Sequence, residues 1–152
     1  KKKINNIYKI KNSVKKEIQK ELKFGLHKFS TYKKFGAKVK KSKKKLLNIF
    51  LKVKNKKIIG YGATAKSCTV LNYCKIGPNF IDYFCDTTSY KINRYLPGSK
   101  ILIKKYKKLS KKNVDIAFLG AWNFKKEIFD KEKNFIKEGG KFITHIPYPK
   151  II

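Results

Sequence analysis

The chain has 152 residues, of which 41% are apolar and 14% aromatic, a length and composition typical of one domain with a hydrophobic core. No apolar run approaches the ~18 residues that a membrane-spanning helix needs, which argues against an integral membrane protein. The first residues carry neither an apolar signal-peptide core nor a methionine, so we expect a cytoplasmic fragment of a longer protein. Cys68, Cys74 and Cys85 form no CxxC pair, which argues against a disulfide scaffold or a zinc site within this chain.

The positive charge is large: 40 lysines and arginines face 9 acidic residues, for a net charge of +31. Such a balance is typical of nucleic-acid-binding proteins. Yet Arg94 is the single arginine, and specific contacts to bases and phosphates favour its bidentate fork. The lysines are spread along the whole chain and accompany many Asn, Ile, Phe and Tyr residues, which share A/T-rich codons. The charge therefore favours a solvated lysine surface, with a basic nucleic-acid-binding module as an alternative.

Two helices are expected in the first third of the chain. Val14, Ile18 and Leu22 recur every four residues and predict a short helix over residues 13–24. After a break near Gly25, Ser30-Thr31 is expected to cap a long helix that continues to about residue 53. One apolar stripe indicates that this helix packs, with a membrane-surface helix as the alternative. The stripe consists of Tyr32, Phe35, Val39, Ser42, Leu46, Ile49 and Val53.

From residue 57 onward, short apolar runs alternate with helical patterns. Such alternation predicts an α/β fold, a three-layer Rossmann-like parallel sheet with helices on both faces. We therefore expect an N-terminal helical extension or linker over residues 1–56 and a Rossmann-like domain over residues 57–152. Strands are expected at residues 57–61, 80–86, 101–103, 114–120 and 141–146. Helical segments are expected from about 65 to 76, near 105–111 and at 123–138, with a long loop at 87–99.

The segment GYGATAKS follows the first expected strand and opens a helix, as a dinucleotide-type phosphate loop does. Gly60 permits a tight turn, Gly62 lets a ligand approach the backbone, and Ala65 keeps helix and strand close. The positive helix N-terminus would hold a phosphate or pyrophosphate. A tight turn without a ligand is the alternative. The candidate binding residues of this segment are Gly60, Gly62, Ala63, Thr64, Ala65, Lys66 and Ser67.

Asp86 ends the second expected strand, where its carboxylate could accept a hydrogen bond from a ribose or sugar hydroxyl. A strand-end turn or an Asx cap is the alternative. The following loop contains Tyr90, Arg94 and Tyr95, and lies at the carboxyl end of a parallel strand, where doubly wound sheets bind ligands. As the single arginine among many lysines, Arg94 indicates a bidentate contact with phosphate or carboxylate. The alternative for Arg94 is an ordinary pair on the surface or within the loop.

The segment after the central strand adds two candidates. Trp122 could stack on a base or sugar, and Asn123 could bind a ligand or cap the next helix. His27 and His145 have no carboxylate near them in sequence and are expected to be structural. We find no Ser/His/Asp, Cys/His or paired-carboxylate arrangement that would indicate a catalytic centre.

The string GYGATAKSCTVLNYCKIGPNFIDYFCDTTSYKINRYLPGSKILI, followed by AWNFKKEI and GGKFITHIP, resembles the C-terminal domain of sugar-nucleotide C-methyltransferases. The resemblance extends upstream into KFGLHKFSTYKKFGAKV and covers roughly residues 23–148. It implies a three-part parent enzyme in deoxysugar biosynthesis. An N-terminal zinc-binding module and a central S-adenosylmethionine-binding domain would precede this Rossmann-like domain.

The resemblance also implies a role for this domain, namely to help hold a nucleotide-diphosphosugar. Methyl transfer would go to a sugar carbon next to a keto group after base-assisted enolisation. This chain lacks the zinc cysteines and the methyl-donor domain, so we expect no catalytic residues and no S-adenosylmethionine bound by the fragment. The expected partners are the sugar nucleotide and the other two domains, not nucleic acid or a membrane. The GxG loop and Asp86 also support an alternative, the NAD-type dinucleotide-binding domain of an oxidoreductase.

Overall fold

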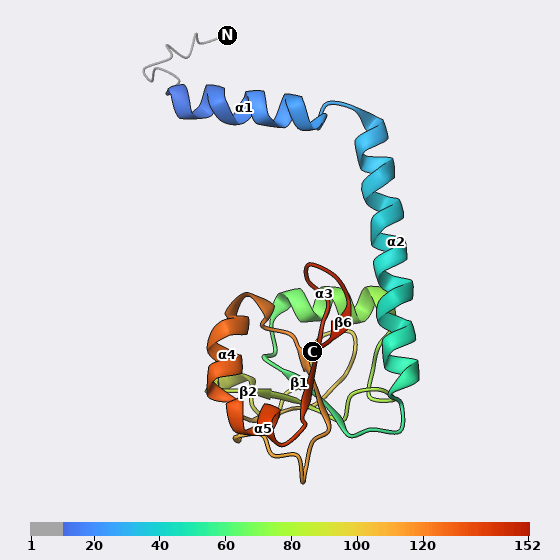
Figure 1. Cartoon of the computed structure of the whole chain (residues 1–152), viewed down its shortest axis with the longest axis vertical. Helices are drawn as coiled ribbons and strands as arrows, with labels where there is room; N and C mark the ends of the chain where they lie inside the picture. The colour runs from blue at the N-terminus through green and yellow to red at the C-terminus, as the bar shows by residue number, and fades with distance from the viewer. Residues whose placement is uncertain (1–10) are drawn as a thin grey trace. The chain divides into compact units, whose positions relative to one another are not determined.

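A six-stranded sheet forms the centre of residues 41–152 in the computed structural model, which describes residues 11–152 (Figure 1). Its strand order is β3-β2-β1-β4-β5-β6, and all neighbours are parallel except β5 and β6. Strands β2 and β3 follow on one side of β1, and β4 and β5 follow on its other side, so the strand order reverses at β1. This topology confirms the expected Rossmann-like α/β fold. The strands are β1 (Ile58–Tyr61), β2 (Phe84–Asp86), β3 (Ile103–Lys105), β4 (Ile116–Leu119), β5 (Lys141–Thr144) and β6 (Lys150–Ile151).

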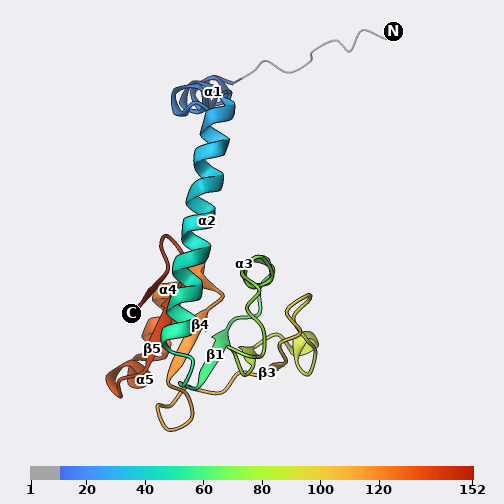
Figure 2. The same ribbon diagram turned by 90° about the vertical axis from the view of Figure 1, so that its right-hand side faces the viewer.

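Helices cover both faces of this sheet. On one face, Leu71 of α3 (Ala65–Cys74) packs with Leu46 and Phe50, around Phe118 of β4. On the other face lie the buried side chains of α4 (Lys125–Lys131) and α5 (Lys133–Lys137). Figure 2 shows α4 and α5 across the strands from α3. Because β1 and β4 are buried on both faces, their sequences are continuous apolar runs rather than alternating ones.

The first two helices are α1 (Asn12–Phe24) and α2 (Phe29–Lys52), close to their expected bounds. The expected cap at Ser30-Thr31 is wrong, because α2 begins before these residues. The Thr31 hydroxyl instead donates to the carbonyl oxygen of Gly25 at 2.8 Å. Gly25 itself ends α1 with a φ of 85°, a left-handed conformation that glycine adopts without steric cost.

The apolar stripe expected along α2 is buried only in its later part. Leu46 and Phe50 are 2% and 0% exposed, whereas Tyr32 and Phe35 are 53% and 66% exposed. The chain divides into two compact units, one ending at Lys40 and one from Lys41 to Ile152. No helix within residues 11–152 is long and apolar enough to cross a bilayer.

Several expected boundaries in the sheet domain need correction. The strand expected at 80–86 begins only at Phe84, because Phe80 and Ile81 donate their N–H groups to the Gly77 carbonyl in a turn. The third strand lies later than expected, at Ile103–Lys105. The expected helix to residue 76 ends at Cys74, and β5 ends at Thr144 rather than 146. Strand β6 was not expected from the sequence.

The helical turn expected near 105–111 is absent from the structure. The N–H of Leu109 donates instead to the carboxylate of Glu132 at 3.0 Å, and a turn forms only after Ser110. The same glutamate interrupts the single helix expected at 123–138. This segment consists of the 3₁₀ helix η2 (Trp122–Phe124), α4 and α5, with a break at Glu132, where φ is −101°.

Candidate functional site

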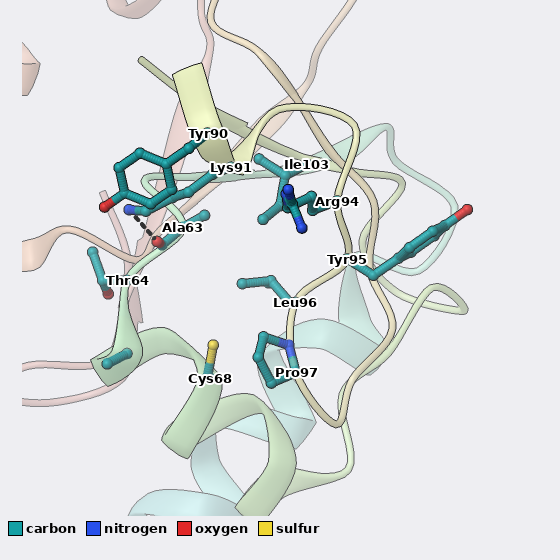
Figure 3. Close-up of a pocket in the computed structure, with 11 residues that line it drawn as sticks. Ala63, Thr64, Cys68, Tyr90, Lys91, Arg94, Tyr95, Leu96, Pro97 and Ile103 are labelled. Atoms are coloured by element: carbon teal, nitrogen blue, oxygen red, sulfur yellow. Dashed lines mark hydrogen bonds between the residues drawn. The ribbon is translucent and has the colours of Figure 1, made fainter. Parts of the chain in front are cut away.

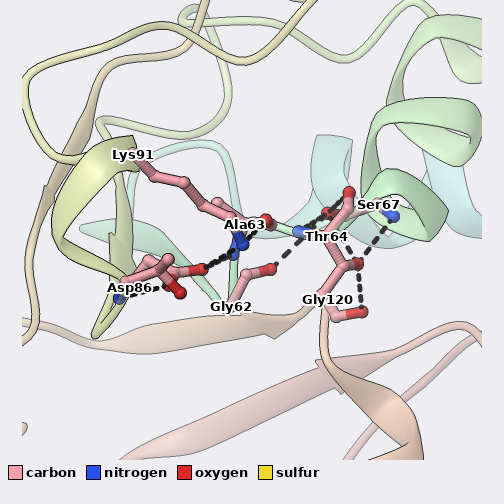
Figure 4. Close-up of polar contacts among 8 residues, drawn as sticks. Gly62, Ala63, Thr64, Ser67, Asp86, Lys91 and Gly120 are labelled. Atoms are coloured by element: carbon pink, nitrogen blue, oxygen red, sulfur yellow. Dashed lines mark hydrogen bonds and ion pairs between the residues drawn. The ribbon is translucent and has the colours of Figure 1, made fainter.

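The loop from β1 into α3 is fixed by hydrogen bonds to neighbouring segments (Figure 4). The N–H of Gly62 donates to the Cys85 carbonyl at 2.9 Å, and the N–H of Ala63 donates to Asp86 Oδ2 at 2.8 Å. Gly62 has a φ of 82°, and a Cβ at this position would lie 2.6 Å from the Cβ of Ala121. Both the backbone conformation and the approach of Ala121 therefore require glycine.

Two hydroxyl groups of this loop cap α3. The N–H of Ser67 donates to Thr64 Oγ1 at 3.1 Å, and the N–H of Thr64 donates to Ser67 Oγ at 3.0 Å, a reciprocal capping box. Thr64 Oγ1 also donates to the Gly120 carbonyl at 3.2 Å, and Ser67 is fully buried. Within residues 11–152, the N–H groups of Ala65 and Lys66 have no hydrogen-bond partner. These two N–H groups are the ones at the start of α3 that remain for an anion.

Asp86 is 9% exposed, and both of its carboxylate oxygens are engaged. Oδ2 accepts from Ala63, Oδ1 accepts the N–H of Thr88 at 2.8 Å, and Lys91 Nζ lies 3.4 Å from Oδ2. Burial alone would raise the pKa of Asp86, but the hydrogen bonds from Thr88 and Ala63 and the charge of Lys91 outweigh it. The pKa of Asp86 is therefore held below its usual value. Asp86 thus forms a strand-end turn that also ties down the β1–α3 loop.

Lys91 is a residue that the sequence reasoning missed. Its Nζ donates to the Ala63 carbonyl at 2.9 Å and lies near Asp86, so Lys91 holds the same loop from the segment that follows β2 (Figure 4). It lies in the 3₁₀ helix η1 (Ser89–Lys91). The signal for it was weak, because one lysine in a loop does not stand out among so many.

A pocket of about 410 Å³ lies between the start of α3 and the loop that follows η1 (Figure 3). Its apolar side is formed by Leu96, Pro97, Ile103 and the half-buried Cys68, whose thiol pKa is raised by burial. The pocket also collects six of the residues predicted from sequence. These are Ala63, Thr64, Ala65, Tyr90, Arg94 and Tyr95.

Arg94 is the charged group of this pocket that is not already engaged. Its guanidinium makes no hydrogen bond or ion pair within the described residues, whereas Lys91 is held by Ala63 and Asp86. Tyr90 and Tyr95 are 73% and 64% exposed at the rim. The ring of Tyr95 points away from the centre of the pocket (Figure 3). Arg94 is therefore the group best placed to bind an anionic ligand.

Lys66, Trp122 and Asn123 form a separate group outside that pocket. Lys66 Nζ lies 5.2 Å from the centroid of the Trp122 ring and 3.4 Å from Asn123 Oδ1. These contacts link the start of α3 to the segment after β4, as expected for residues at the carboxyl ends of adjacent parallel strands. Asn123 caps neither η2 nor α4, so the capping alternative for this residue is wrong.

The remaining predicted glycine, Gly60, has a packing role. A Cβ at Gly60 would lie 2.2 Å from the ring of Phe84 on the neighbouring strand. Gly60 thus lies in the strand and makes room for an aromatic core residue. Several of the predicted residues already pack or hydrogen-bond within the fold, namely Gly60, Gly62, Ala63, Thr64, Ser67 and Asp86.

The sequence reasoning also missed a buried carboxylate. Glu132 is fully buried, and its Oε1 accepts hydrogen bonds from the hydroxyls of Tyr61 at 3.0 Å and Tyr106 at 2.6 Å. Burial, together with Glu132, raises the pKa of Tyr106 to about 12. A signal existed in the sequence, because Glu132 follows Ile128 by four residues and precedes Phe135 by three. That spacing places it on the buried helix face.

Tyr61 and Tyr106 also line a second pocket, of about 240 Å³, at the ends of β1, β2 and β3. Gly62, Asp86 and Lys91 take part in its lining. Glu132 therefore positions two side chains that line the 240 Å³ pocket.

Neither histidine takes part in these pockets. His145 is 5% exposed, stacks on Phe118 with ring centroids 5.4 Å apart, and its Nδ1 has no partner in the part of the chain that the structure describes. Burial lowers its pKa to about 4, so it is neutral at pH 7. His27 is exposed. Among residues 11–152, no three His, Cys, Asp or Glu side chains gather in a group that could hold a metal ion.

The fold is that of a Rossmann-like α/β domain, and comparison with known proteins assigns its family. Residues 1–147 match the C-methyltransferase C-terminal domain family, and the chain belongs to this family. The resemblance found in the sequence motifs is thereby confirmed.

A curated relative is the C-methyltransferase NovU of Streptomyces niveus, 40% identical over 97 residues. The comparison covers 64% of this chain but 23% of NovU, so the chain spans about a quarter of that relative's length.

Proposed function

We propose that this chain is the nucleotide-diphosphosugar-binding C-terminal domain of an S-adenosylmethionine-dependent sugar C-methyltransferase. The observation that carries the proposal is Arg94, an unengaged guanidinium in a pocket of about 410 Å³ beside the start of α3. Family membership supports the link to methyl transfer. The sequence motifs and the chemistry of the pocket support a sugar nucleotide as ligand.

The pocket offers complementary surfaces to the two chemical parts of such a ligand. The planar fork of Arg94 matches phosphate oxygens, and the unpartnered N–H groups of Ala65 and Lys66 add donors at the positive end of α3. Leu96 and Ile103 form an apolar side that suits the face of a base or a deoxysugar. Lys66, with Trp122 beside it, would extend the binding surface toward the segment after β4.

The methyl donor is proposed to bind elsewhere in the parent protein. The resemblance to sugar-nucleotide C-methyltransferases implies that the methyl donor binds in a central domain of the parent protein. Membership of a C-methyltransferase C-terminal domain family also counts against an NAD-type oxidoreductase domain. A central donor-binding domain and a zinc-binding module of the parent chain would be its partners.

No general base for enolisation is poised in the 410 Å³ pocket. His145 is buried away from it, and Asp86 is held by backbone N–H groups. We therefore propose that the chain binds its ligand without catalysing transfer by itself. Its three cysteines are free, which fits the reducing cytoplasm as its compartment.

The lysine surface gives little support to specific nucleic-acid binding. At six places in the described chain a lysine ammonium lies over an aromatic ring of the same protein. Such lysines cover the protein's own apolar surface, which agrees with a general solvating role.

Titration calorimetry on the full chain tests the proposal. The ligands are UDP-glucose, dTDP-glucose, NAD, S-adenosylmethionine and a random 20-base-pair duplex, each at physiological salt. We expect at least one sugar nucleotide to bind more tightly than NAD or S-adenosylmethionine. Binding to the duplex should collapse between low and physiological salt, because diffuse lysines act by counterion release. Preferential NAD binding, or salt-resistant duplex binding, would contradict the proposal.

A further inference from the structure

The unit that ends at Lys40 has no hydrophobic core of its own within its described part, residues 11–40. Gly25 is the one buried residue among them, and none of the residues of α1 is buried. Yet Val14, Ile18 and Leu22 share one face of α1 and are 48%, 47% and 45% exposed. We refer to these three side chains as the α1 stripe.

Local interactions are too weak to account for α1 as an independent helix. It has 13 residues, and isolated helices of fewer than ~12–15 residues are marginal in water. Its N-terminus has no side-chain cap, and the pair of Lys20 with Glu17 is solvent-exposed, so it contributes little. Helices of this length are stabilised mainly by burial of an apolar face. A stable α1 therefore requires a surface that covers the α1 stripe.

We propose that the α1 stripe docks on the part of the parent C-methyltransferase that precedes this domain. This inference rests on the proposed function, namely that the chain works within a longer enzyme. The family is a C-terminal domain, and the chain spans 23% of NovU, so most of such an enzyme would join ahead of α1. The preceding part is thus tethered next to α1, at a high effective concentration.

The charged residues beside the α1 stripe indicate which charges a complementary partner surface would carry. Successive helical residues are ~100° apart, so Lys15 borders one side of the stripe, and Glu17 and Glu21 border the other. The partner surface is accordingly an apolar groove with an acidic rim on one side and a basic rim on the other. Lys16 and Lys20 lie on the far face of α1 and remain in water. The asymmetry of the two rims fixes the direction in which α1 lies in the groove.

The test uses the full chain and, as a separate polypeptide, the preceding part of the same C-methyltransferase. Binding is measured by sedimentation velocity, and backbone hydrogen exchange follows residues 12–24. We expect the partner to slow exchange in α1 at least tenfold. Ile18→Lys should weaken binding at least tenfold, whereas Gln19→Lys, the same new side chain one position off the stripe, should change it less than twofold. Lysine is as good a helix former as either residue, so neither change unfolds α1.

Equal loss in both variants, or no binding, would overturn the inference. Protection of α1 that rises with the concentration of the chain alone, and is lost in Ile18→Lys, would identify a second copy as the occupant and would overturn it too. The affinity for a sugar nucleotide is measured in parallel on the isolated chain. It should be unchanged in Ile18→Lys, because the 410 Å³ pocket contains no residue of α1. Docking without sugar-nucleotide binding would refute the ligand proposal and leave the docking surface in place.

Discussion

The carboxylate of Asp86 accepts the backbone N–H of Ala63 at 2.8 Å, which ties the end of β2 to the loop that opens α3. The same oxygen lies 3.4 Å from Lys91 Nζ, which in turn donates to the Ala63 carbonyl. The backbone N–H and the backbone carbonyl of Ala63 are thereby both hydrogen-bonded, to side chains at the end of β2 and in the segment that follows it. The position of the α3 N-terminus, and with it the geometry of the proposed anion site, depends on this pair.

Asp86→Asn should destabilise the chain by about 1–3 kcal/mol, because an amide accepts at one atom where the carboxylate accepts at two. Denaturant titration at pH 7 measures the change. Asp82→Asn is the matched control, since Asp82 is exposed and should change stability by less than about 0.5 kcal/mol. Because the folded pKa of Asp86 is lowered, its contribution is complete above the unfolded value of ~3.9 and is lost as pH falls through the folded pKa. Equal stability of the two variants would show that the Asp86 contacts are unimportant.

Glu132→Gln should also destabilise, by about 1–3 kcal/mol. The new amide NH₂ would face either the N–H of Leu109 or the hydroxyls of Tyr61 and Tyr106, leaving buried donors without an acceptor. Glu127→Gln, at an exposed position of α4, serves as the control. A wild-type unfolding midpoint for Glu132→Gln would mean that this cluster is not needed to hold the sheet edge.

His145 should make stability depend on pH in a different window. Its folded pKa is about 4, below the unfolded value of ~6.5, so the unfolded state binds more protons between these values. The stabilising contribution is complete above ~6.5 and declines, by up to ~1.4 kcal/mol per pH unit, down to about 4. Denaturation curves from pH 7 to pH 4.5 should show this slope, and His145→Leu should remove it. An unchanged slope in the variant would assign the dependence to other groups.

The sequence was sufficient to predict the parallel strands of the sheet, because β1 and β4 are continuous apolar runs followed by glycine-containing turns, whereas the two-residue antiparallel strand β6 was not predicted. The sequence also located the loop at Gly60–Ser67 and the Arg94 segment. The glycine spacing and the single arginine can be recognised without knowing which residues lie nearby in space. The sequence could not reveal Lys91, whose role depends on the spatial closeness of Ala63 and Asp86. The helix break at Glu132 was missed for the same reason, because its hydrogen-bond partners lie far away in sequence.

The prediction of the site was limited in the same way, because the sequence does not show which side chains are hydrogen-bonded to one another. Thr64 and Ser67 have the residue types of phosphate-binding loops, but only the structure shows that their hydroxyls cap α3. The sequence marks which groups are suited to bind a phosphate, whereas the hydrogen-bond network determines which of them are still free.

The central claim is that Arg94 binds the diphosphate of a nucleotide-diphosphosugar. Calorimetric titration of the best-binding sugar nucleotide into the wild type, Arg94→Lys and Arg94→Gln tests it most directly. Both variants should bind at least tenfold more weakly, a loss of about 1.4 kcal/mol or more, with unchanged unfolding midpoints. Lys112→Gln removes one positive charge outside the 410 Å³ pocket and should change affinity less than twofold. Equal affinities in the wild type and both Arg94 variants would contradict the account.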